Sequence, residues 1–181
     1  MYEPPSNYIP QFGNDRRPLF VWLVLCAAAL LFVVLILGAP MAKAQGANAV
    51  SFTIYQAFSH VCHQLPERSF FLAGYPLAVC ARCTGAYLGF AAAIMSYPLI
   101  TSLKSTRIPE MKWLFIAAVP LAIDFLLGLT GIWENTHRTR FTTGALLGGV
   151  VVFFVMPALA ELSLRFKTSQ TTPQVNQTPT T

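Results

Sequence analysis

Residues 80–103 read CARCTGAYLGFAAAIMSYPLITSL, and no charged side chain occurs between Arg82 and Lys104. The uncharged part, residues 83–103, has roughly the 20 residues that a helix needs to cross the hydrocarbon core of a bilayer. Pro98 would interrupt a helix in water, but packed neighbours satisfy the freed backbone groups of membrane helices. The stretch therefore predicts a transmembrane helix that begins at a pair of cysteines.

Three further stretches have the same apolar character, at residues 18–42, 113–133 and 141–163. The whole chain is 55% hydrophobic and only 10% charged, which is far from the composition of a soluble domain. Glycines at 144, 148 and 149 would let the last helix approach a neighbour closely. We predict an all-α, polytopic membrane protein with four transmembrane helices.

The first apolar stretch also fits a cleavable signal peptide. Arg16 and Arg17 precede it, and Ala42-Lys43-Ala44 before Gln45 matches a cleavage site with small residues. Cleavage would leave three transmembrane helices. The apolar core, residues 19–37, exceeds the roughly 7 to 15 residues of a signal-peptide core, which favours retention as a helix.

Four helices divide the rest of the chain between two sides of a membrane. The tails 1–17 and 164–181, which we expect to be disordered, share one side with the loop 104–112, and the loops 43–82 and 134–140 share the other. The first side carries seven lysines and arginines against five. The positive-inside rule then puts both tails in the cytoplasm. This topology accounts for the net charge of +5 without a nucleic-acid partner. The expected partner is the lipid bilayer.

Three of the four cysteines lie in or next to the outer loop, while Cys26 lies in the first apolar run as a small core residue. The two-residue spacing of Cys80 and Cys83 lets both sulfur atoms reach one metal ion or each other. Cys83 begins a helix, where the helix dipole and the adjacent Arg82 favour a thiolate. This cluster is the strongest chemical signal in the chain.

Two chemistries fit the cluster best. In the first, three thiolates and one imidazole bind zinc. The ligands are Cys62, Cys80, Cys83 and His63, with His60 or His137 as the alternative imidazole. In the second, Cys80 and Cys83 are the redox pair of a membrane thiol-disulfide oxidoreductase. A redox metal or haem, a static disulfide, and a non-enzymatic membrane subunit or carrier stay open as alternatives.

A second group of residues could serve catalysis. Asp124 would be costly in a membrane helix unless it is paired, protonated or hydrated, so it is a functional candidate. The alternative is a neutral acid bonded between helices, for instance to Tyr87 or a threonine. The loop 134–140 could close over the cysteines, with Arg138 or Arg140 binding an anionic group, or it could be a solvated connector. The catalytic candidates are Asp124, Glu134, His137 and Arg140, with Glu67 as a further acid or base beside a metal.

The outer loop also carries a longer motif, in which CHQxPxRSF is followed by CxRCTGxYxG. Its residues are Cys62, His63, Gln64, Pro66, Arg68, Ser69, Phe70, Gly74 between the two parts, Cys80, Arg82, Cys83, Thr84, Gly85, Tyr87 and Gly89. The motif resembles that of an uncharacterised family of prokaryotic integral membrane proteins of unknown function. The family is also similar around residues 120–124 and 140–144, but it has glycine where this chain has Phe125, which leaves less room beside Asp124.

The resemblance implies a multi-pass protein of the cell membrane of a prokaryote, and no established activity. The placement of the cysteine pair is also similar to that in quinone-linked disulfide oxidases. Those enzymes have a second cysteine pair in another loop, and residues 134–140 contain none.

Overall fold

The computed structural model describes residues 16–131 and 135–171, and this part of the chain is mainly helical. Its helices are α1 (Arg17–Ala44), α2 (Asn48–Ser59), α3 (Ala81–Ile100), α4 (Lys112–Thr130) and α5 (His137–Thr171). A 3-10 turn, Pro66–Arg68, and a hairpin of β1 (Phe71–Leu72) and β2 (Tyr75–Pro76) complete it. Within the described residues, α1, α3, α4 and the part of α5 from His137 to Ser163 are long and apolar enough to cross a membrane. The predicted all-α fold with four transmembrane helices is confirmed.

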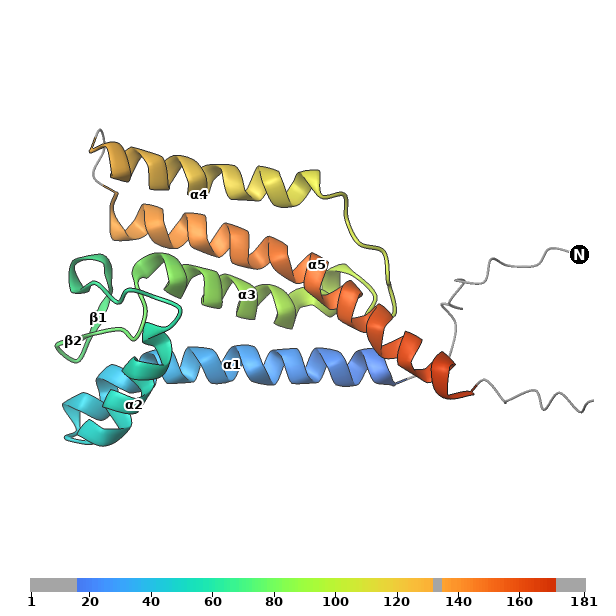
Figure 1. The fold of residues 1–181 in the computed structure, drawn as a ribbon, viewed down its shortest axis with the longest axis horizontal. Coiled ribbons are helices and arrows are strands. Elements are labelled where there is room, and N and C mark those ends of the chain that lie inside the picture. Colours follow the sequence, from blue (N-terminus) through green and yellow to red (C-terminus); the bar gives the residue numbers. More distant parts are fainter. Residues whose placement is uncertain (1–15, 132–134, 172–181) are drawn as a thin grey trace, which may run out of the picture.

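The four long helices lie side by side, and α2 and the hairpin cover one end of them (Figure 1). Helix α3 packs between α1 and α5, and α4 packs on α5. The amino ends of α3 and α5 and the carboxyl end of α4 therefore meet beside the hairpin. Residues far apart in the sequence come together at this end.

Helix α5 differs most from its predicted span of 141–163. It begins at His137, because the side chain of Thr136 accepts a hydrogen bond from the Thr139 backbone N–H at 3.2 Å, as an N-cap does. His137 and Arg140 therefore lie in the first turns of a helix instead of in a loop. The helix also continues to Thr171, into the predicted tail 164–181, since no glycine or proline interrupts residues 158–171. The predicted tail 1–17 lies almost wholly outside the described residues.

Close contact between α3 and α5 forms the centre of the bundle. A side-chain methyl group at Gly85 of α3 would overlap the Phe141 carbonyl of α5, and one at Gly148 of α5 would overlap the Ala86 carbonyl of α3. Small residues allow this approach, and packing then stabilises helix pairs in lipid, where no hydrophobic force drives them together. The expected close approach of the last helix is confirmed at Gly144 and Gly148, whereas Gly149 makes only ordinary contact.

Gly148→Ala should destabilise the protein by about 1–3 kcal/mol, because the new methyl group forces two backbones apart. Gly149→Ala is the matched control on the same helix, since its methyl group would lie 3.7 Å from the nearest atom, the Gly89 carbonyl oxygen. Thermal unfolding in detergent measures both. Equal stability of the two variants would contradict the close contact.

The outer loop 43–82 contains the amphipathic helix α2, which we did not predict from the sequence. Residues Ser51, Ile54, Tyr55 and Phe58 recur at helical spacing, and Phe58 is buried against α1 in a cluster with Ile36. The Ser51 hydroxyl donates to the Ala39 carbonyl at 2.9 Å and fixes α2 to the end of α1. The loop is thus a folded cap on the bundle.

Candidate metal centre

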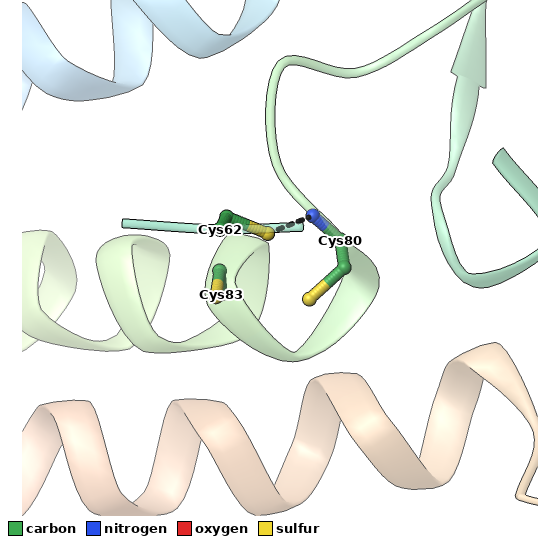
Figure 2. Close-up of side chains that lie close together, drawn as sticks. All are labelled: Cys62, Cys80 and Cys83. Carbon is green, nitrogen blue, oxygen red and sulfur yellow. Dashed lines mark hydrogen bonds between the residues drawn. The ribbon is translucent and has the colours of Figure 1, made fainter. Parts of the chain in front are cut away.

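Three cysteines, one from the cap and two from the start of α3, meet at the amino end of this helix (Figure 2). Cys62 follows α2, Cys80 is the N-cap residue of α3, and Cys83 lies in its first turn. Their Sγ atoms all lie within 4.8 Å of one another. Three thiolates bound to one zinc ion at ~2.3 Å with tetrahedral angles would lie about 3.8 Å apart. The cluster therefore needs only small side-chain movements to bind one ion.

Gln64 fixes the position of Cys62 against α3. Its backbone has a left-handed φ of 52°, and its side-chain amide donates to the carbonyls of Tyr55 and Ala78, each at 2.8 Å. One side chain thus ties the segment after α2 to the segment before α3. The Cys80 backbone N–H donates to the Cys62 sulfur at 3.2 Å (Figure 2).

The environment of Cys80 favours its thiolate. Hydrogen bonds from the thiols of Cys62 and Cys83 hold the pKa of the Cys80 thiol well below its ordinary value, and the helix dipole acts in the same direction. Cys62 is buried, and Cys80 and Cys83 are half-buried. A thiolate among shielded thiols can bind a metal ion or attack a disulfide.

The histidines are not part of this group. His63 is exposed and lines the same 350 Å³ cavity as the three thiols, but it does not join the ligand atoms that lie within 4.8 Å. His60 is exposed at the end of α2, and His137 is exposed with its ring centre 5.6 Å from that of Phe70. The group in the described residues thus contains three thiols, and its imidazole ligand stays a prediction.

An ion pair that we did not predict from the sequence lies beside the thiols. Arg82 Nη2 donates to Asp124 Oδ2, which joins α3 to α4. The guanidinium lies 5.7 Å from the centre of the Phe125 ring, and Asn135 donates to the Asp124 backbone carbonyl. Asp124 therefore has a cationic partner, in place of the Tyr87 or threonine that we expected for a neutral acid.

The other catalytic candidates differ in whether they line the 350 Å³ cavity of the three thiols. Arg140 lines this cavity, as Arg68 does. Arg138 and Glu67 are exposed and do not line it. Glu134 lies outside the described residues. The outer end of the bundle thus brings three thiols next to three arginines, Arg68, Arg82 and Arg140.

Comparisons with known proteins agree with the membrane architecture. The chain is 36% identical over 146 residues to "Uncharacterized protein MJ1492" from Methanocaldococcus jannaschii, which covers 78% of this chain and 94% of that protein. It is 37% identical over 87 residues to an "Uncharacterized protein" from Methanothermobacter thermautotrophicus, covering 48% and 77%. No solved structure matches the chain.

A family model described as "Predicted membrane protein (DUF2085)" matches residues 62–154, from the first cysteine of the cluster to the middle of α5. This match spans the cysteines, Arg82, Asp124 and Arg140, which form the site described above. The expected membership of an uncharacterised prokaryotic family of membrane proteins is confirmed. The chain belongs to the DUF2085 family of predicted membrane proteins.

Proposed function

We propose that this membrane protein binds one zinc ion through Cys62, Cys80 and Cys83. The observation that carries the proposal is the mutual approach of the three sulfur atoms within 4.8 Å. Soft thiolate ligands select zinc, copper(I) or iron–sulfur clusters over calcium and magnesium, and a compact set of three cysteines with one further ligand is a common zinc site.

His63 is the fourth ligand in this proposal. It follows Cys62 directly, lines the same cavity and is exposed, so its side chain is free to change rotamer toward the sulfur atoms. Coordination by His63 would close the tetrahedron and make the site structural. A water molecule in its place would leave an open, catalytic position in the cavity that Arg140 also lines.

The site lies on the extracytoplasmic side in this proposal, with both tails in the cytoplasm. The excess of lysine and arginine on the side of the tails supports this orientation. An oxidising compartment would convert unprotected neighbouring thiols to disulfides. A bound metal ion would therefore keep these cysteines reduced.

A thiol-disulfide oxidoreductase is the competing function, and the lowered pKa of Cys80 favours it. Metal content and free thiols, counted on Cys26→Ala protein purified in detergent without chelator, separate the two functions. We expect about one zinc ion per chain, and three thiols that react only after the metal is removed. A disulfide between Cys80 and Cys83 without metal would support the oxidoreductase and exclude the zinc site.

A further inference from the structure

Three arginines from three separate elements surround the space beside the thiols. Arg68 comes from the 3-10 turn, Arg82 from α3 and Arg140 from α5. All three line the 350 Å³ cavity that contains the thiols, and all three line a second cavity of 260 Å³. The convergence of three guanidinium groups is independent of whether the thiols bind metal.

The positive charge of these arginines is only partly compensated. Asp124 pairs with Arg82, but neither Arg68 nor Arg140 has an ion pair with a carboxylate in the described part of the chain. No carboxylate occurs among the described residues that line the two cavities. Arginine stays protonated at neutral pH, so the three arginines together with Asp124 carry an excess of about two positive charges, which the Cys80 thiolate in the 350 Å³ cavity reduces to about one.

Two of the arginines also have unused hydrogen-bond donors. The Nε atoms of Arg82 and Arg140 are buried and have no partner among the residues that the structure describes. Buried donors without an acceptor are costly, and the great majority in folded proteins are satisfied. An oxygen-rich anion in the cavity would supply the missing acceptors and compensate the charge.

We propose that Arg68, Arg82 and Arg140 bind a phosphate group. A guanidinium presents paired N–H donors that match two oxygen atoms of a phosphate group, or the two oxygen atoms of a carboxylate. Phosphate is favoured here because its three terminal oxygen atoms can accept hydrogen bonds from guanidinium groups on three separate elements, whereas a carboxylate has only two oxygen atoms. The second cavity has a volume of 260 Å³, several times the roughly 30 Å³ that one water molecule occupies in the liquid, so it has room for a phosphate group.

The phosphate group could belong to a free anion or to a lipid headgroup. The site lies at one end of the bundle, where headgroups are found (Figure 1). Two residues of its wall, Phe125 and Leu129 of α4, are exposed. The 350 Å³ cavity also opens around exposed residues of the cap, such as His63 and Leu65, which gives a path from water. Both sources present the same oxygen atoms to the arginines.

Isothermal titration of the protein in a neutral maltoside detergent tests the proposal with two probes, inorganic phosphate and dioctanoyl phosphatidic acid. Arg140→Gln and Arg68→Gln should each weaken binding roughly 10- to 100-fold, because each removes a charge-assisted hydrogen-bonding group. Arg138→Gln is the matched control. It removes the same charge from the same helix, but Arg138 is exposed and lines neither cavity.

Arg68 lies in an exposed turn, so Arg68→Gln is expected to fold even if Arg140→Gln does not. Binding of inorganic phosphate that depends on Arg68 or Arg140 supports the site with a free anion as ligand. Binding of phosphatidic acid alone, with the same dependence, supports it with a lipid headgroup. Absence of binding for both probes, or an equal loss in Arg138→Gln, would overturn the proposal.

Discussion

Cys83→Ser protein should bind zinc at least about 100-fold more weakly than the unaltered protein. Even residues that only contact a metal ligand change affinity by about 10- to 100-fold, and Cys83 is a direct ligand in our account. Serine preserves the size of the side chain but replaces the soft thiolate by a hydroxyl, which is a poor zinc ligand at neutral pH. Competition with a chelator of known zinc affinity measures the change.

Cys26→Ser provides the control for this substitution. Cys26 is buried between α1 and α3, with its sulfur atom 3.9 Å from the Ile94 carbonyl oxygen, and it belongs to a separate core cluster. Its replacement should leave zinc affinity unchanged. If Cys83→Ser and Cys26→Ser bind zinc equally well, Cys83 is not a ligand.

Asp124→Leu should destabilise the protein by about 3 kcal/mol, at the lower end of the cost of breaking a buried ion pair. The substitution leaves the Arg82 guanidinium without its carboxylate at the contact between α3 and α4. We expect the lower end because the Arg82 side chain is 22% exposed, so water can solvate part of the released charge. Unfolding of the purified protein in detergent measures the loss.

The double variant Arg82→Leu/Asp124→Leu tests whether the pair itself is responsible. Removing both charges leaves no uncompensated group, so the double variant should be more stable than the sum of the two single effects predicts. Additive effects of the two substitutions would show that the residues do not interact. The more conservative Asp124→Asn keeps a polar acceptor and should cost less than leucine.

The helical fold could be predicted from the sequence because bilayer thickness sets the length of an apolar run. Residues 83–103 and 113–133 fulfil this requirement before any neighbour is considered. The ends of the helices follow less closely from the sequence, because capping residues decide them. The side chain of Thr136 caps α5, so this helix begins at His137, before the apolar run that starts at residue 141. Helix α2 was missed although Ser51, Ile54, Tyr55 and Phe58 carry its spacing, because the segment is short and lies between turns.

The site could be predicted only in part. Cys80 and Cys83 are close in sequence, so their proximity requires nothing beyond one helix turn. Cys62 joins them because Gln64 connects two distant backbone segments, an arrangement that depends on the folded loop. The pairing of Arg82 with Asp124 depends on which helices are neighbours, and apolar composition does not specify that order. A carboxylate within an apolar run did signal that Asp124 must be paired, protonated or hydrated, but it did not indicate which of these applies.

X-ray absorption at the zinc edge of the purified protein tests the zinc site most directly. Our account predicts three sulfur ligands at ~2.3 Å and one nitrogen ligand at ~2.0–2.1 Å, with the nitrogen lost in His63→Ala protein. A water oxygen as the fourth ligand would revise the role of His63 but keep the three thiolates. A zinc ion without sulfur ligands, or protein without zinc and with a disulfide between Cys80 and Cys83, would contradict the account.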